Sequence, residues 1–348
     1  MHTLTETAFY SRTAIKYTVA FLIFLVLGRV VWIVGFNAFR YFFPKPPPPP
    51  TVSFGKLPEL LFPSQENLPK FSYTLELPEG ELPTTPPSLP VFTMPLPRSS
   101  LVALDETRRV ATRLGFTVGE ESISQSIYRF RRKDVPATLE ANIITGAFSI
   151  NYNLINDPTP FSGHPPTAEA AAAAIRSFLS SADLLPEDFT NGQISSQFLK
   201  LEGAALVTVP SLSEANFVRV DFFRQEYNEL PVVTRSGTSG NVWFLVSGLT
   251  TRERQIIAGE YHYFPVDIGS SGTYPIKTAQ TAWEEFNSGQ GAIISPGNNK
   301  ERVIIRRVYL SYYDNSEPQE FFQPVFVFEG DNDFVAYLSA VTSDYYGE

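Results

Sequence analysis

The residue types that supply nucleophiles, proton carriers and metal ligands are scarce in this chain or lie at the wrong spacing. There are three histidines, His2, His164 and His262, and no cysteine. The histidines do not form HExxH or another metal-binding motif, and without cysteine there is no thiolate zinc site, thiol nucleophile or disulfide. A G-x-S-x-G nucleophile motif is absent, and the stretch GTSG lacks the lysine of a phosphate-binding loop. We therefore predict a protein without catalytic residues, cofactor or metal.

Carboxylates are the remaining route to chemistry, because the chain has 36 acidic residues. A pair of carboxylates is enough for glycoside hydrolysis and depends on three-dimensional spacing instead of a motif. The segment EGDND also places three carboxylates close together, on Glu329, Asp331 and Asp333. It lacks the other positions of an EF-hand loop and its distal glutamate. We interpret it as a hairpin turn, with calcium binding as the alternative.

The segment YRFRRKD combines aromatic and basic residues. If it forms a strand, Arg129, Arg131 and Lys133 share one face, because side chains alternate between the faces of a strand. The simpler interpretation of this basic stripe is a strand face exposed to solvent. The functional alternative is contact with an anionic envelope polymer or with lipid headgroups.

The overall composition describes a chain with a real hydrophobic core and an acidic surface. Hydrophobic residues make up 43% and aromatic residues 14%, which excludes disorder throughout. The formal net charge of −9 disfavours a nucleic-acid-binding protein, which needs a basic face against phosphates. We expect no nucleic-acid partner.

The N-terminal region contains a long apolar run that determines where these residues act. Tyr17 to Phe36 gives 20 residues with one charge, enough to cross a hydrocarbon layer of ~30 Å. The run lacks the polar stripe of a soluble core helix. A cleaved signal peptide is the alternative, but bulky Trp32 and Phe39 stand where its cleavage site needs small residues. We predict a short tail over residues 1–16 and a transmembrane anchor over 17–43.

Arg29 is the single charge within this run. A central arginine costs about 2.5–3.5 kcal/mol on insertion scales, which the apolar neighbours offset. It either extends toward the nearer membrane interface or contacts another membrane helix, so it is our candidate membrane-partner contact. Basic residues flank both ends of the run, but the short tail and long body favour a signal anchor with an extracytoplasmic body.

Residues 44–98 are rich in proline, and we predict a linker there. Five consecutive prolines in PKPPPPP enforce polyproline II, a stiff rod of ~3.1 Å per residue. A spacer is the simplest reading, and docking to an aromatic-lined groove is the alternative. The segments VSFGKLPELLF and FSYTLEL are apolar enough to pack along the body.

Three segments beyond Ser99 carry apolar residues at helical spacing: LDETRRVATRLGF, TAEAAAAAIRSFLSSADLL and IKTAQTAWEEFNSGQG. Thr167 is placed to cap the second helix, and Gly115 and Gly289 end the first and third. The residues expected to face the core are Thr107, Val110, Ala111 and Leu114; Ala168, Ala171, Ala172, Ile175, Phe178 and Leu179; and Ala279, Ala282, Trp283 and Phe286.

Strand patterns follow each helix. In ANFVRVDFF, apolar residues alternate with Arg219 and Asp221. NVWFLVSG and IIAGEYHYFPVD are expected to be hairpin neighbours after the turn TRSGTSG, and QPVFVFEGDNDFVAYLSAV to be two strands joined by EGDND. In RVIIRRVYLSYYD, one face is expected to carry Ile304, Val308, Leu310 and Tyr312. This layout predicts an α+β fold of tandem helix-plus-antiparallel-meander units over residues 99–160, 161–275 and 276–348.

These units resemble the PepSY and YycH/YycI type of extracytoplasmic domain, most closely at ANIITGAFSINY and QPVFVFEGDNDFVAYL. The whole plan also resembles uncharacterised single-span, membrane-anchored surface proteins of candidate-phylum bacteria, through the anchor, the proline rod, FGKLP and QPVFVFEGD. The resemblance implies regulation through contacts with membrane partners or through inhibition of envelope enzymes.

These observations lead to one functional hypothesis and two alternatives. We expect a non-catalytic binding or regulatory module, anchored in the cell membrane by a single pass. Its partners would be the lipid bilayer and a membrane or envelope protein. The alternatives are an envelope hydrolase that acts on glycan or peptide with paired carboxylates, and a structural envelope subunit.

Overall fold

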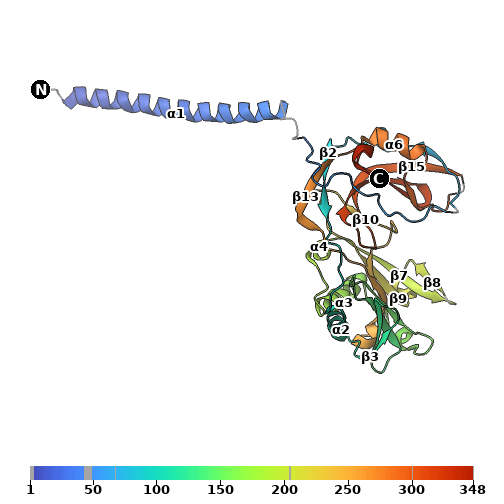
Figure 1. Cartoon of the computed structure of the whole chain (residues 1–348). Coiled ribbons are helices and arrows are strands. Elements are labelled where there is room, and N and C mark those ends of the chain that lie inside the picture. Colours follow the sequence, from blue (N-terminus) through green and yellow to red (C-terminus); the bar gives the residue numbers. More distant parts are fainter. Residues whose placement is uncertain (1–3, 43–48, 67, 204, 300, 348) are drawn as a thin grey trace. The chain divides into compact units, whose positions relative to one another are not determined.

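The computed structural model describes residues 4–42, 49–66, 68–203, 205–299 and 301–347 (Figure 1). In the N-terminal helix it describes the side chains of residues 15–19 and 21–36. The chain divides into two compact units, Met1–Pro49 and Pro50–Glu348, which we call the N-terminal unit and the body.

The N-terminal unit is one helix, α1 (Leu4–Phe42). Its segment Ile15–Phe36 is long and apolar enough to cross a membrane, and all of its described side chains are exposed. The helix form and the lack of a buried face agree with the predicted anchor. Most of the predicted proline rod lies outside the described residues.

Residues 101–226 and 240–261 of the body are built on a nine-stranded antiparallel sheet, and we call this part the nine-stranded lobe. Helices α2 (Ala103–Arg113) and α3 (Ala168–Ser180) pack on one face, where Phe178 meets Phe244 edge-on with ring centroids 5.8 Å apart. Short helical turns α4 (Glu187–Thr190), α5 (Arg252–Gln255), η1 (Thr159–Ser162) and η2 (Leu212–Glu214) lie in its connections. In spatial order the strands are β3 (Val118–Ser122), β4 (Ile127–Arg131), β5 (Ala137–Asn142), β6 (Phe148–Tyr152), β12 (Ile256–Tyr261), β11 (Val242–Val246), β9 (Phe217–Phe222), β7 (Ile194–Glu202) and β8 (Ala205–Val209).

The rest of the body, the C-terminal lobe, contains a six-stranded and a three-stranded sheet. The first consists of β1 (Ser72–Leu75), β15 (Arg302–Asp314), β17 (Pro324–Gly330), β18 (Phe334–Ser339) and β14 (Ala292–Ser295), with β10 (Val232–Thr234) also paired to β15. The second has β13 (Asp267–Pro275), β2 (Ser88–Thr93) and β16 (Phe321–Phe322) in that order. Helix α6 (Ala279–Asn287) packs on the larger sheet, where the rings of Phe286 and Phe328 stack at 4.4 Å. Turns η3 (Asp331–Asp333) and η4 (Ser343–Tyr345) complete it.

The three predicted helices are confirmed, with their ends set by local chemistry. The side chain of Thr167 accepts a hydrogen bond from the Ala170 amide at 3.3 Å, as expected of a helix cap. Gly115 and Gly289 follow α2 and α6 with φ of +89° and +94°, a region that favours glycine. The residues of the predicted stripes that are buried are Ala111, Leu114, Ala171, Ala172, Ile175, Phe178, Leu179, Ala279, Ala282 and Phe286.

The expected hairpins are also present, but the predicted core face of RVIIRRVYLSYYD is wrong at Ile304. The pairing of β15 with β17 shifts between Ile305 and Arg307. A bulge of this kind moves the residues before it to the other face, so Val303 and Ile305 enter the core in place of Ile304. In β9, the alternation places Asp221 on the face opposite the helices, where it is nevertheless covered: it is 1% exposed and accepts a hydrogen bond from the Gly240 amide at 2.9 Å.

The mixed α+β class is shown, whereas the sheets cut across the expected units. The pair β6–β12 joins residues 148–151 to 258–261, so one sheet spans the expected boundary at residue 160. The C-terminal lobe also takes β1 and β2 from the expected linker region. Leu57 within FGKLP is fully buried, which fits the expectation that parts of the linker pack along the body.

Candidate functional site

The nine-stranded sheet has an outer face, opposite the helices, that carries a straight row of polar side chains. Cross-strand partners in register run from β3 to β7, and we call this set the outer polar row: Glu121, Arg129, Glu140, Ser149, Glu260, Trp243, Asp221 and Ser195. At about 4.8 Å between neighbouring strands, the row is roughly 34 Å long. Side chains directly opposite each other on a sheet are close enough to interact, and three neighbouring pairs of the row do so: Glu121 with Arg129, Arg129 with Glu140, and Trp243 with Glu260.

Ion pairs and ring contacts hold the row together. Arg129 donates from Nε and Nη2 to Glu140 Oε1 at 2.8 and 2.7 Å. Trp243 donates from its ring nitrogen to Glu260 at 3.3 Å, and the guanidinium of Arg219 lies 4.1 Å above the Trp243 ring. Stacked arginine and tryptophan side chains on an accessible face are typical of binding hot spots in protein interfaces.

Two adjoining hollows follow this row, and we call them together the trough. The first has a volume of about 410 Å³ and is lined by the outer face, the β5–β6 turn and the loop Ser316–Pro318 of the C-terminal lobe. The second has a volume of about 400 Å³ and lies over β4, β5 and β6. They share Glu140 and Ser149. Each volume lies within the range of ~300–1,000 Å³ known for ligand sites.

The structure places two residues of the predicted basic stripe in the trough and the third outside it. Arg129 and Arg131 line the second hollow, and Arg131 also pairs with Glu121 at 2.7 Å. Lys133 lies beyond the end of β4 and does not line either hollow. The neighbouring Arg132 instead points inward, where its guanidinium lies 4.3 Å from the Phe116 ring and burial lowers its pKa to about 10. Arg29 is exposed on α1.

Two of the three carboxylates of EGDND, those of Glu329 and Asp331, bond the β17–β18 hairpin to β15. Asp331 accepts two hydrogen bonds from Arg306, at 2.9 and 2.8 Å, and these lower the pKa of Asp331. Glu329 accepts from the Tyr309 hydroxyl at 2.6 Å and from Arg307 at 3.0 Å. Within the described residues, no group of three or more His, Cys, Asp or Glu side chains is arranged to hold a metal ion.

The two histidines that the structure describes do not form a common site. His262 lines the first hollow, with Nε2 at 3.8 Å from Glu260. His164 is exposed in a loop of the nine-stranded lobe, and His2 lies outside the described residues.

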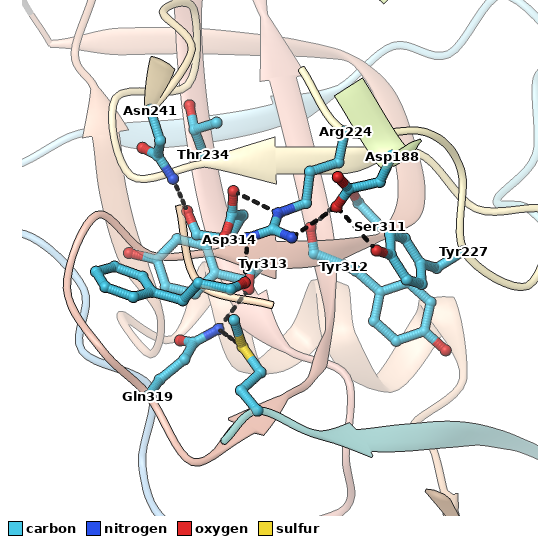
Figure 2. A network of polar contacts seen from close by, with 12 residues as sticks. Asp188, Arg224, Tyr227, Thr234, Asn241, Ser311, Tyr312, Tyr313, Asp314 and Gln319 are labelled. Carbon is cyan, nitrogen blue, oxygen red and sulfur yellow. Dashed lines mark hydrogen bonds and ion pairs between the residues drawn. The ribbon is translucent and has the colours of Figure 1, made fainter. Parts of the chain in front are cut away.

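A second polar cluster lies buried where the two lobes of the body meet, and we call it the joint (Figure 2). Arg224 donates to Asp314 from Nε at 2.9 Å and from Nη2 at 3.1 Å, to Asp188 from Nη1 at 2.8 Å, and to the Phe264 carbonyl from Nη2 at 2.7 Å. Asp188 belongs to the nine-stranded lobe and Asp314 ends β15 of the C-terminal lobe. The Tyr227 hydroxyl donates to Asp188 at 3.1 Å.

The buried guanidinium of Arg224 and the carboxylates of Asp188 and Asp314 stabilise one another in their charged forms. Burial alone would lower the pKa of Arg224, but the charges of Asp314 and Asp188 together raise it, so the guanidinium stays protonated. Burial raises the pKa of Asp314, and Arg224 offsets only part of this effect. Asp314 is enclosed by its partners and does not line the trough. The cluster therefore fixes one lobe on the other and does not present a carboxylate to a substrate.

Sequence reasoning found two arginines of the trough and missed most of the rest. Glu140 and Glu260 of the trough, and Trp243 beside it, come from three strands whose order depends on the β6–β12 pairing. A usable signal was the polar member of each alternating strand pattern, since Glu260 and Glu140 are flanked by apolar residues on both sides.

Comparison with known proteins gives a weak structural likeness. No protein-family model matches the chain, and no curated protein matches it in sequence. Among solved structures, an uncharacterized protein from Eubacterium rectale is 12% identical with a TM-score of 0.36, over 75% of this chain and 84% of that one. The YpeB C-terminal domain of Bacillus megaterium is 13% identical with a TM-score of 0.33, over 71% and 95%. YycH of Bacillus subtilis is 11% identical with a TM-score of 0.34, over 80% and 59%.

Proposed function

We propose that the chain is a single-pass, membrane-anchored module whose body binds another protein of the cell envelope and thereby regulates it, without catalysis. The observation that carries this proposal is the trough, a hollow polar surface with stacked Arg219 and Trp243 beside it. Two of its carboxylates are tied to neighbours on the same sheet, Glu140 to Arg129 and Glu260 to Trp243, and the third, Glu317, pairs with Arg235 at 3.3 Å. This arrangement suits contact with a partner surface better than proton transfer to a substrate.

The anchor supports the same proposal. The apolar segment Ile15–Phe36 has the length and composition of a membrane span, and the body has its own hydrophobic cores. A partner in or near the same membrane would meet the body at high effective concentration, so a weak contact is enough for regulation.

The test is photocrosslinking in native membranes, with a crosslinking amino acid placed at exposed positions over the body and bound proteins identified by mass spectrometry. We expect one dominant membrane or envelope protein, lost when α1 is replaced by a cleavable signal sequence. The proposal is wrong if the full chain gives no specific crosslink at any position. Protease added to intact cells tests the topology: a body that is digested only after lysis would show that it does not face outward.

A further inference from the structure

The trough has ends of opposite charge. The first hollow is lined by Glu140, Glu260 and Glu317, and its described lining residues include no lysine or arginine. The second hollow is lined by Arg129 and Arg131 and by the shared Glu140, which pairs with Arg129, so Arg131 gives this end its net positive charge. A ligand that complements the whole trough therefore carries positive charge over the β12 end and negative charge over the β4 end.

Both ends have the capacity to bind a further charged group. Arg131 is 54% exposed in its side chain and has five N–H donors, which its single pair with Glu121 does not exhaust. Glu317 is 63% exposed and meets Arg235 at 3.3 Å through one oxygen. A charge-assisted hydrogen bond to either end is stronger than a neutral one.

The middle of the trough accepts uncharged atoms. Ile127, Ala147 and Pro318 line the first hollow and offer apolar contact to the stems of long side chains. Ser149 and Asn151 supply hydroxyl and amide groups. This mixture is suited to a polypeptide backbone with spaced side chains.

The spacing of the ends determines the length of the ligand. Glu260 and Arg129 are in one row, on β12 and β4, with β6 and β5 between them. Three strand intervals of about 4.8 Å give about 14 Å. An extended chain advances about 3.3 Å per residue, so about four residues cover this distance.

We propose that the trough binds an extended peptide segment of an envelope protein that has a basic residue at one end and an acidic residue about four positions away. The basic side chain lies over Glu260 and Glu317, and the acidic one over Arg129 and Arg131. This inference rests on the proposed function and specifies the chemistry of its partner.

The binding test uses the full chain in nanodiscs of zwitterionic lipid and fluorescently labelled peptides. The probe is KKSTSTEE, whose inner lysine and glutamate are five positions apart and so about 16 Å apart in an extended chain. The matched control is KESTSTEK, which has the same composition but carries one charge of each sign at both ends. We expect KKSTSTEE to bind at least tenfold more tightly. Equal affinities, or no binding of either peptide at millimolar concentration, would overturn the proposal.

Variants assign the ends. The double variant Glu260→Gln with Glu317→Gln should remove the preference for KKSTSTEE and leave the affinity for SSSTSTEE unchanged. Arg131→Gln should lower the affinity for SSSTSTEE, the peptide that has only the acidic end. Glu284→Gln, on the exposed side of α6, is the control and should change neither. If Arg131 controls binding of phosphatidylglycerol vesicles and no peptide binds, the trough is a lipid-headgroup site and the peptide proposal is wrong.

Crosslinking separates this inference from the proposed function. A photocrosslinker at Ser149, in the centre of the trough, should capture the native partner, whereas one at Arg109, exposed on α2, should not. If only the crosslinker at Arg109 captures a protein, the proposed binding function stands but the trough is not the binding site. Absence of capture at every position would reject both.

Discussion

Substitution of Arg224 by methionine is the sharpest test of how the body is held together. The side chains of Arg224, Asp188 and Asp314 are 1%, 7% and 3% exposed. Arg224→Met preserves much of the volume but leaves two buried carboxylates without their counter-charge. Removing one partner of a buried ion pair costs about 3–5 kcal/mol, a large part of the ~5–15 kcal/mol that stabilises a typical domain.

Two reference variants isolate the cause. Lys200→Met breaks the exposed pair of Lys200 with Glu202, whose side chains are 44% and 57% exposed, and should cost less than about 1 kcal/mol. Combining Arg224→Met with Asp188→Asn and Asp314→Asn removes the unpaired charge, and we expect it to recover a substantial part of the loss.

The assay is urea unfolding of the full chain in detergent micelles, followed by fluorescence in single-tryptophan backgrounds. Trp243 reports on the nine-stranded lobe and Trp283 on the C-terminal lobe. When Arg224 is present, we expect the unfolding transitions reported by Trp243 and Trp283 to coincide. In Arg224→Met the free energy of unfolding should fall by about 4 kcal/mol, and the two transitions should separate. A loss no greater than that of Lys200→Met would refute the assignment of Arg224 as the residue that joins the lobes.

The pH dependence of Arg224→Met has a definite sign. Burial already raises the pKa of Asp314, and removing Arg224 raises it further, above the value of about 3.9 for an unfolded chain. The folded variant then binds a proton that the unfolded chain has released, so its stability falls as pH rises through the folded pKa. The destabilisation should therefore be larger at pH 7 than at pH 4.

Three further predictions concern other parts of the body. Hydrogen bonds from Thr159 and Tyr152 lower the pKa of Asp157, so its stabilisation is complete above about pH 4 and lost in more acidic solution; the unfolding free energies of wild type and Asp157→Asn should converge as pH falls from 7 to 2. Thr167→Ala should cost about 1 kcal/mol in urea unfolding through loss of the α3 cap, and Thr167→Ser should retain it. Phe286→Ala should cost about 3–5 kcal/mol by removing a ring stacked on Phe328, with Gln280→Ala on the exposed side of α6 as a near-neutral control.

Local features of the fold were predictable from the sequence, whereas its pairing was not. Thr167 and Gly289 mark helix ends because a cap and a left-handed residue act within one turn. The bulge in β15 leaves no local mark, so alternation alone placed Ile304 on the wrong face. The β6–β12 pair unites segments more than a hundred residues apart, and its formation depends on the shared core instead of local propensity.

The candidate site divides in the same way. Arg129 and Arg131 were recognisable because two basic residues two positions apart share a face of any strand. Glu260 and Trp243 could not be recognised as part of the site from the sequence, because only the strand register places them in one row with Ser149 and Glu140. Arg224 and Asp314 are separated by 90 positions, and a buried ion pair of this kind has no sequence pattern.

The joint and the trough are physically connected, which gives a final prediction. Asp314 is held by Arg224, and two positions later begins the loop Ser316–Pro318 that forms one wall of the trough. Phe264 also lines the first hollow, and its carbonyl accepts from Arg224. Loss of these bonds frees the wall, so more conformations must be fixed when a peptide binds.

Arg224→Met should accordingly weaken KKSTSTEE binding although Arg224 does not line the trough. Glu260→Gln with Glu317→Gln should abolish the preference for that peptide while changing the free energy of unfolding by less than about 1 kcal/mol, because the two side chains are 48% and 63% exposed. The measurement is peptide affinity at urea concentrations at which each variant remains folded. Unchanged affinity in folded Arg224→Met would show that the wall holds its position without the joint, and the coupling between lobe contact and binding would then be wrong.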